Sequence, residues 1–489
     1  ITNHSFLDNP TFRGMRQSLL KSFNKIYILD LHGNSKKKEK SPDGSKDENV
    51  FDIEQGVSIN LFIKSKNKKE AIYYANLWGK RHHKYQQLLE MDLEKTPWQE
   101  ITPSSPFYFF IPQNNQLREI YDQGWKIPDI FPKNSVGIVT GRDHLTIQSS
   151  PEEVEKTIKE FSSLDSEIAR EKYQLGHDSS DWQIKLAQED LLNGKLDKNK
   201  IVPIAYRPFD VRYTYYTGKP GGFHARPRQE IMSHMLIAEN TSLTLVRQFK
   251  TGDFYQHTLV NNYILECCLV SNRTSEIGYA FPLYLYPSSK DLPKKPAGLF
   301  DQPQSNQLPE SQENITSTFR QALTCLYQKY YTPEEILGYI YAVLHNPTYR
   351  QKYKEFLKSD FPKIPLVKKA ELFEELSTLG WQLVQAHLLK KIPAGLRLTL
   401  SKTNNYKVEK PLYQADQQRL YINKGFYMEP VPPAVWNFHI GGYQVLDKYL
   451  KSRLGRELGL DDINHIEKVI KVLDFTIQQM QKIDAVGAI

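Results

Sequence analysis

A chain of 489 residues exceeds one ordinary domain, so two or three domains are expected. Hydrophobic residues make up 39% of the chain and charged residues 25%, a balance typical of globular proteins and not of disordered ones. No apolar run approaches the roughly 18 residues that a membrane span needs, and the start of the chain carries no signal-peptide pattern. The net charge of +8 permits an anionic partner without identifying one.

Cysteine usage bounds the chemistry further. Three cysteines, of which Cys267 and Cys268 are adjacent, are too few for a disulfide framework or a zinc cage. This usage predicts a reducing, cytoplasmic setting. The histidines show no ligand spacing with carboxylates or cysteines, so no metal site is expected. Because the chain opens on Ile1 and not on Met, we expect a fragment or a processed product.

The first 150 residues carry an α/β pattern. Residues 6–20 have apolar side chains at helical spacing, and Asn9 followed by Pro10 is typical of a helix cap and its first turn. A polar stretch at 32–48 is long enough to predict a functional or disordered loop. Strands are expected at 25–31, 57–63 and 106–111.

Helices and then strands dominate the remainder. A capping box at Ser150 with Pro151 in the first turn opens a helical connector over 151–200. Tyr- and Arg-rich strands follow, and residues 288–315 have the composition of a linker. Later helices are expected after Thr332, after Asn346, and along 372–387 and 463–477. The fold class is therefore α/β followed by α+β, with segments 1–150, 151–200 and 201–489.

Several catalytic motifs are absent from the sequence. It has no G-x-x-x-x-G-K-[ST] phosphate loop, no G-x-G of a dinucleotide or glycine-rich cofactor loop, and no G-x-S-x-G or H-E-x-x-H. Pro42-Asp43 could open a nuclease carboxylate set, but the segment that follows ends Glu54-Gln-Gly56 and lacks the Glu-x-Lys that such a set needs. The sequence thus argues against an ATPase, a dinucleotide enzyme or a nuclease, and no catalytic residue is assigned.

Short motifs along the chain resemble those of one protein family, and they occur in the same order. The segments resemble the part of gamma-type amino-methyltransferases that follows the catalytic Asn-Pro-Pro-Tyr, and the single-polypeptide type ISP restriction–modification enzymes in particular. The matching segments are Thr2-Asn-His-Ser-Phe-Leu-Asp8, Phe12-Arg-Gly-Met-Arg16, Ile28-Leu-Asp-Leu-His-Gly-Asn34, Asp47-Glu-Asn-Val-Phe-Asp-Ile53, Gly137-Ile-Val-Thr-Gly-Arg-Asp143, Tyr206-Arg-Pro-Phe-Asp210, Tyr215-Tyr-Thr-Gly218, Arg226-Pro-Arg228, Phe281-Pro-Leu-Tyr284 and Trp436-Asn-Phe-His-Ile-Gly-Gly442.

The resemblance implies a fold and a function. It implies the C-terminal part of a Rossmann-like adenine-N6 methyltransferase sheet, the helical connector, and a mixed target-recognition domain with C-terminal helices. The implied partners are double-stranded DNA and the N-terminal methyltransferase half, with nuclease and helicase-like domains. S-adenosylmethionine would bind in the full enzyme, because both the cofactor glycine motif and Asn-Pro-Pro-Tyr are missing from this sequence. The alternative is a stand-alone DNA-binding specificity module without catalysis.

Three residues of the first segment could contact DNA. In the family that the chain resembles, the aromatic residue at the position of Phe51 packs on an extruded adenine, which needs flat faces in place of its lost stacking. The alternative is that Phe51 is a core residue beneath the sheet edge. Lys37, in the basic run 36–40, could neutralise phosphate or belong to a solvated loop. Arg142 could touch DNA or pair with Asp143 to fix a turn.

Residues 206–250 are the strongest candidates for reading bases. Seven basic residues against three acidic ones are interleaved with aromatic residues and the loop Thr217-Gly-Lys-Pro-Gly-Gly222. Arginine can bind guanine in a bidentate manner, and glycines let a backbone approach the duplex. The alternative is an ordinary strand pair in which Arg207 and Asp210 pair for structure. The candidate DNA-binding residues here are Arg207, Arg212, Tyr216, Lys219, His224, Arg226, Arg228 and Arg247.

Overall fold

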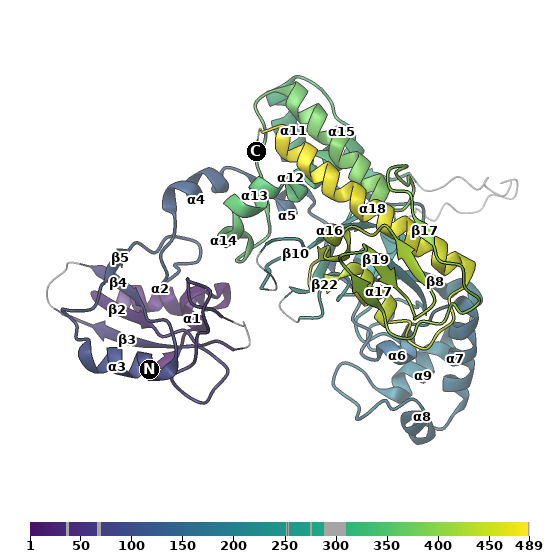
Figure 1. Ribbon diagram of the computed structural model, residues 1–489, viewed down its shortest axis with the longest axis horizontal. Coiled ribbons are helices and arrows are strands. Elements are labelled where there is room, and N and C mark those ends of the chain that lie inside the picture. Colours follow the sequence, from purple (N-terminus) through teal and green to yellow (C-terminus); the bar gives the residue numbers. More distant parts are fainter. Residues whose placement is uncertain are drawn as a thin grey trace, which may run out of the picture. The chain divides into compact units, whose positions relative to one another are not determined.

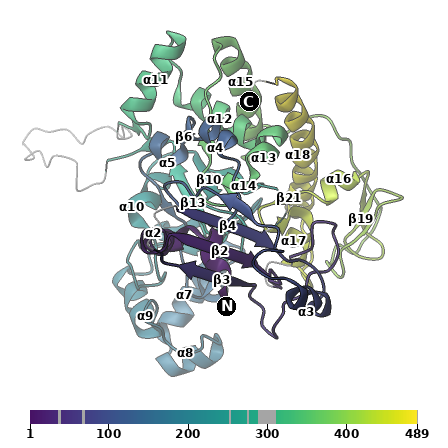
Figure 2. The same cartoon turned by 90° about the vertical axis from the view of Figure 1, so that its left-hand side faces the viewer.

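The computed structural model describes residues 1–35, 39–65, 70–250, 252, 254–273, 276–287, 310–487 and 489. They form two compact units, residues 1–123 and residues 124–489, of mixed α/β structure (Figures 1 and 2). Among the described residues, no helix is both long and apolar enough to cross a membrane. The functional division at residues 150 and 200 stays a prediction.

The first unit is built on one mixed sheet with the strand order β1-β3-β2-β4-β5. β2 runs parallel to β4 and antiparallel to β3. Ile26 and Ile28 face a core closed by the helix α2, whereas Leu29 faces a second core that Leu88 of α3 joins. The sheet is therefore covered on both faces, as its apolar β2 requires (Figure 1). Its elements are β1 Thr2–Asn3, α1 Ser5–Asp8, η1 Pro10–Phe12, α2 Arg13–Ser22, β2 Lys25–Asp30, β3 Val57–Ile63, β4 Ala71–Asn76, α3 Arg81–Glu90, β5 Gln99–Ile101 and α4 Asn115–Asp122.

Two local expectations for this unit have different outcomes. Asn9 does cap the turn that begins at Pro10, because its side-chain oxygen accepts a hydrogen bond from the Thr11 amide at 3.0 Å. The strand expected at 106–111 is wrong. Tyr108 adopts a left-handed conformation with φ +53°, which breaks any extended run. The segment instead turns so that its apolar side chains enter the core and the Phe107 carbonyl accepts hydrogen bonds from the buried Arg16.

In the first part of the second unit, the helices α7–α9 and neighbouring strands share one core. Ser150 caps α7 through the Glu153 amide, and Val154, Ile158 and Phe161 face inward, as expected. Trp182, Tyr215 and Phe223 belong to the same core. The elements of this part are β6 Trp125–Lys126, α5 Ile127–Ile130, β7 Ser135–Val136, α6 Asp143–Thr146, α7 Pro151–Ser163, α8 Ser166–Lys172, α9 Ile184–Asn193, η2 Lys198–Lys200, β8 Ile201–Arg207, β9 Asp210–Tyr215, α10 Gln229–Met232, η3 Ser233–Met235, β10 Ser242–Val246, β11 Thr258–Asn261, β12 Ile264–Leu265, β13 Gly278–Pro282 and β14 Tyr284–Leu285.

Small sheets and long helices complete this unit. The sheets have the orders β12-β8-β9, β11-β10-β13-β7 and β17-β20-β19-β18. The expected linker falls at 288–309 outside the described residues, while its end forms a strand paired with β14. The remaining elements are β15 Gln312–Glu313, α11 Ser317–Tyr327, α12 Pro333–His345, α13 Pro347–Lys352, α14 Lys354–Leu357, β16 Lys363–Ile364, α15 Ala370–His387, β17 Thr399–Leu400, β18 Leu412–Gln414, β19 Arg419–Tyr421, β20 Tyr427–Glu429, α16 Pro433–Trp436, β21 His439–Ile440, β22 Tyr443–Gln444, α17 Val445–Lys451 and α18 Leu460–Ala485.

The four expected C-terminal helices are confirmed, and two of them touch through glycines. Thr332 and Glu335 form a complete capping box on α12, and Asn346 caps α13. α12 and α15 approach so closely that a Cβ atom at Gly380 would lie 1.9 Å from the carbonyl oxygen of Gly338. This contact fixes how the helices pack, because any side chain there would force the two backbones apart.

Gly380→Ala should therefore destabilise the second unit. We expect the free energy of unfolding to fall by about 2 kcal/mol or more, since the added methyl group meets backbone that no rotamer change can move. Urea unfolding followed by circular dichroism measures it. The control is Gly395→Ala in the same unit, where a Cβ meets nothing within 4 Å, so stability should change by less than about 1 kcal/mol. Equal effects of the two substitutions would contradict this packing.

Candidate nucleic-acid interface

The glycine-rich loop after β9 is held by a buried carboxylate. Asp190 of α9 is 3% exposed and accepts hydrogen bonds from the Thr217 hydroxyl at 2.7 Å and the Phe223 amide at 2.9 Å. A Cβ atom at Gly222 would lie 2.2 Å from the Asp190 carboxylate oxygen. A glycine is required at this position because the loop backbone passes directly over that side chain. The loop thus has a fixed path although four of the six residues 217–222 are glycine or proline.

The structure brings this loop together with the other polar turn that the sequence singled out. Arg226 and Val139 exchange backbone hydrogen bonds of 2.9 and 3.0 Å, so residues 217–228 run beside the turn at 140–143. The indole N–H of Trp182 donates to the Phe223 carbonyl at 3.2 Å. Sequence reasoning missed Asp190 and Trp182, because only folding places the α9 region beneath the loop.

Two of the basic side chains on this loop reach solvent. Lys219 at the loop tip is exposed. The Arg226 side chain is 52% exposed, and its guanidinium pairs with Asp181 at 2.7 Å, a residue that is itself 53% exposed. Such an exposed pair contributes little to stability, so a phosphate or a base edge could replace Asp181 at small cost. Lys219 and Arg226 are the two side chains of this loop best placed to meet an anionic partner.

Two further candidates are only partly available. Arg228 is half-buried in a left-handed conformation with φ +57°. Its Nε atom is buried without a hydrogen-bond partner among the described residues. Arg247 is 50% exposed and pairs with Asp360 at 3.0 Å. Lys37 lies outside the described residues.

Arg142 has a structural role in the turn, but not the one weighed from the sequence. Its guanidinium donates hydrogen bonds to the carbonyls of Leu175, Gly141 and His177 and lies 5.0 Å from the Trp182 ring centre. Asp143 instead accepts hydrogen bonds from Thr140 and Tyr206. The turn is therefore fixed without an Arg142–Asp143 pair.

Arg207 and Arg212 are held inside the protein. Arg207 is 10% exposed and pairs with Glu266, and its guanidinium lies 3.8 Å from the Tyr206 ring centre. Arg212 pairs with Asp210 at 3.0 Å. The pairing of Arg207 with Asp210 that the sequence allowed is replaced by these two pairs.

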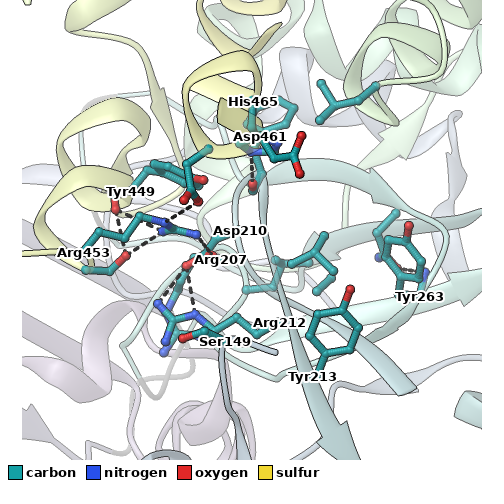
Figure 3. A pocket seen from close by; sticks show the side chains of 18 of the residues that line it. Ser149, Arg207, Asp210, Arg212, Tyr213, Tyr263, Tyr449, Arg453, Asp461 and His465 are labelled. Atoms are coloured by element: carbon teal, nitrogen blue, oxygen red, sulfur yellow. Dashed lines mark hydrogen bonds and ion pairs between the residues drawn. The ribbon is translucent and has the colours of Figure 1, made fainter. Parts of the chain in front are cut away.

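Asp210 is the centre of a second charged group, at a cavity of about 780 Å³ (Figure 3). Arg453 pairs with it at 2.8 Å, and Arg212 approaches from β9. Burial would raise the pKa of Asp210, but the two guanidinium groups outweigh burial and hold that pKa below its usual value. Because Asp210 engages both arginines and Glu266 engages Arg207, these charges stabilise the cavity wall and carry little attraction for an outside anion.

Two candidates from the sequence are buried, which corrects their assignment as DNA contacts. His224 is fully buried, and its Nε2 atom lies 2.8 Å from the Thr214 hydroxyl. Burial lowers the pKa of His224 to about 4, so the ring is neutral near pH 7. Tyr216 is 6% exposed and donates a hydrogen bond to the Pro227 carbonyl at 2.9 Å. Both side chains support the loop from below and present no surface to a duplex.

In the first unit, Phe51 projects from a structured loop. Its side chain is 43% exposed, so it is not a core residue, while its neighbour Val50 is 3% exposed and anchors the loop in the core. The Asn49 side chain accepts a hydrogen bond from the Phe51 amide at 2.9 Å. An exposed ring on a fixed backbone can offer a flat apolar face to a ligand.

Two groups of side chains have the composition of a metal site. In the described part of the chain these are His4, Asp30 and His32, and the trio Glu266, Cys267 and Cys268. In the first group, His4 Nδ1 already contacts Asp30 at 3.0 Å. In the second, Glu266 pairs with Arg207 and accepts from the Cys267 thiol at 3.1 Å. The ligand atoms of both groups therefore interact with each other or with neighbouring charges.

Known structures share the fold of the whole chain. The DNA-bound, ATP-dependent Type ISP restriction–modification enzyme LlaBIII matches 99% of this chain with a TM-score of 0.70 at 22% identity. A nuclease-deletion mutant of the Type ISP enzyme LlaGI, in complex with a DNA substrate mimic, matches 99% with a TM-score of 0.66 at 18% identity. A DrdV–DNA complex matches 100% with a TM-score of 0.68 at 22% identity.

These matches cover only part of the other proteins. The chain spans 32% of the LlaBIII chain, 45% of the LlaGI chain and 50% of the DrdV chain. No curated protein matches the chain in sequence. The family profile of the Type ISP C-terminal specificity domain, however, matches residues 129–482, which include the loop 217–228 and the buried charges around Asp210. The chain therefore belongs to the Type ISP C-terminal specificity domain family.

Proposed function

We propose that the chain recognises duplex DNA in a sequence-dependent manner as the specificity part of a Type ISP restriction–modification system. The observation that carries the proposal is the loop 217–228, which a buried carboxylate holds rigid and which presents Lys219 and Arg226 to solvent. LlaBIII and DrdV, which share the fold, are described as bound to DNA, and this supports the same partner class here.

The two exposed side chains suit different tasks. Lys219 is a flexible point charge that can neutralise phosphate without reading sequence. Arg226 extends from a backbone fixed by paired hydrogen bonds to Val139, so its planar guanidinium can be directed at a guanine edge. Asp181 holds Arg226 in the free protein and is displaced on binding. Breaking the Arg226–Asp181 pair has a cost for every DNA contact that Arg226 makes. A weak, non-specific contact does not offset this cost, whereas a contact that satisfies the whole guanidinium group does.

The first unit, in this proposal, is the end of an adenine-N6 methyltransferase core. Its mixed sheet with parallel β2 and β4 and helices on both faces supports a Rossmann-like origin. S-adenosylmethionine would supply the methyl group. The residues present do not fit its site, because the glycines of the loop after β2 (Gly33, Gly44 and Gly56) are widely spaced and form no G-x-G. We therefore assign cofactor binding and the Asn-Pro-Pro-Tyr motif to protein outside these 489 residues.

Selection from a random duplex library tests sequence-dependent recognition. We expect one sequence to be enriched, and the logarithm of its association constant to fall linearly with the logarithm of salt concentration, because phosphate contacts release counterions. Fluorescence anisotropy at several salt concentrations measures both effects. Equal affinity for the enriched duplex and for a scrambled duplex would contradict sequence-dependent recognition.

Substitutions at the loop locate the interface. Arg226→Ala should weaken binding to the enriched duplex about 10- to 100-fold, as expected for loss of a bidentate base contact, and Arg228→Ala should weaken it as well. Asp181→Asn should tighten binding, because it frees Arg226 from its partner. The matched control is Lys329→Ala, since Lys329 is 51% exposed and pairs with Glu374 as Arg226 does with Asp181. A loss at Lys329 equal to that at Arg226 would move the interface elsewhere.

Phe51 is tested with duplexes that have an abasic site opposite the target adenine, which we call mismatched duplexes. An abasic site opposite the target adenine lowers the cost of extruding that base, so a protein that captures the base binds such a duplex more tightly than the paired one. We expect this preference in the parent protein and a several-fold smaller preference in Phe51→Ala. Affinity for the paired duplex should change far less than it does in Arg226→Ala. A parent protein without any mismatch preference would instead behave as a recognition module that does not extrude bases.

A further inference from the structure

The first unit contains a buried lysine whose ammonium group is fully hydrogen-bonded. Lys84 of α3 is 0% exposed. Its Nζ atom lies 2.7 Å from the Asp47 carboxylate, 2.6 Å from the Leu31 carbonyl oxygen and 2.7 Å from the Glu48 carbonyl oxygen. An ammonium has three N–H donors, and three acceptors surround this one. A charge buried in this way is stable only while each of these partners stays in place.

Asp47 extends the same network to the ends of two strands. Its carboxylate accepts hydrogen bonds from the Gly33 amide at 2.7 Å and from the Gly79 amide at 2.8 Å. Gly33 follows β2, Gly79 follows β4, and Asp47 itself lies in the loop that leads into β3. The ion pair therefore joins both ends of the long β2–β3 loop to the short loop after β4, at the carboxyl ends of the parallel strands.

The joined loops leave Phe51 little freedom. Asn49 donates to the Gly33 carbonyl at 3.1 Å, and a Cβ atom on Gly33 would come within 2.4 Å of the Asn49 backbone. Arg81, on the helix that carries Lys84, donates to the Asn49 carbonyl at 2.7 Å and to the Phe51 carbonyl at 3.0 Å. The backbone is thus fixed on both sides of the exposed ring.

We propose that the Asp47–Lys84 ion pair is the positioning device that fixes the Phe51 ring for contact with an extruded base. The proposal rests on the function proposed above for Phe51, and both residues act through the loop and do not touch DNA. Hydrogen bonds to a buried charge are directional, so they set the loop in one register, which apolar packing of the same volume would not do. A ring fixed before binding loses less entropy when a base stacks on it.

The pair can be removed without leaving a buried charge. Lys84→Met alone strands the Asp47 carboxylate in the core, so that variant tests folding more than positioning. The double variant Asp47→Asn with Lys84→Met keeps the volume and removes both charges. The control is Lys95→Met, whose ammonium is 71% exposed and pairs with Asp92. All variants are made in the full chain.

Amide hydrogen exchange and mismatch binding together give the test. In the double variant we expect exchange of residues 45–56 to accelerate at least tenfold while strand residues 25–30 stay protected. We also expect its preference for the enriched duplex with an abasic site opposite adenine to fall as far as in Phe51→Ala, with affinity for the paired duplex within about twofold of the parent, since a purely structural defect would lower both affinities. Lys95→Met should match the parent in every measurement.

The outcomes separate the two proposals. Unchanged exchange at 45–56 overturns the positioning role, as does faster exchange with an unchanged mismatch preference. If strand 25–30 also loses protection, the pair supports the whole unit, and positioning of the ring is likewise overturned. If Phe51→Ala itself leaves the mismatch preference intact, the base-binding function of Phe51 fails, while exchange at 45–56 still reports whether the ion pair orders the loop.

Discussion

The hydrogen bonds of the Asp190 carboxylate to Thr217 and Phe223 are the interaction on which the candidate interface depends. They couple α9 to the loop after β9, and the pairing of Arg226 with Val139 couples that loop to the turn at 140–143. A loop of such composition would otherwise sample many conformations, and each contact with a duplex would then cost ordering entropy. Because the buried carboxylate orders the loop when the protein folds, this entropy is lost on folding and not on binding.

The arginines of residues 206–250 separate into two kinds by how their charge is compensated. Arg207 and Arg212 have buried acidic partners and stack on Tyr206, so releasing either would leave a carboxylate uncompensated in the interior. Arg226 has an acidic partner that is itself exposed, from which an anion could displace it at little cost. Arg247 lies between these cases, because its partner Asp360 is mostly buried and also pairs with Lys126. The degree of burial of the acid, and not the arginine itself, decides which side chains are available.

The loop that carries Arg226 and the loop that carries Phe51 are stabilised in the same way. In each unit, an exposed side chain projects from a loop that a buried carboxylate fixes. Asp190 accepts from the Thr217 hydroxyl and the Phe223 amide in the loop of Arg226, and Asp47 accepts from the Gly33 and Gly79 amides beside the loop of Phe51. A carboxylate can accept several hydrogen bonds at once, which suits it to joining segments that are distant in the sequence. Neither aspartate is recognisable as a support from the sequence, because nothing in the local pattern distinguishes such a residue from a surface acid.

The sequence by itself determined the elements whose signals are local. The capping box at Thr332, the side-chain caps at Ser150 and Asn9 and the spacing of apolar residues in α7, α12, α15 and α18 act within a few residues, so reading them needed no fold. The reciprocal half of the box expected at Ser150 does not form, because the Glu153 side chain accepts from the Ser149 amide. The order of short motifs along the chain indicated the family. Tertiary structure alone decided that 106–111 is not a strand, that His224 and Tyr216 are buried, and that Arg207 pairs with Glu266. Burial and charge pairing arise between segments that lie far apart in the chain, up to 243 residues for Asp210 and Arg453, and no local pattern in a single sequence encodes which segments meet.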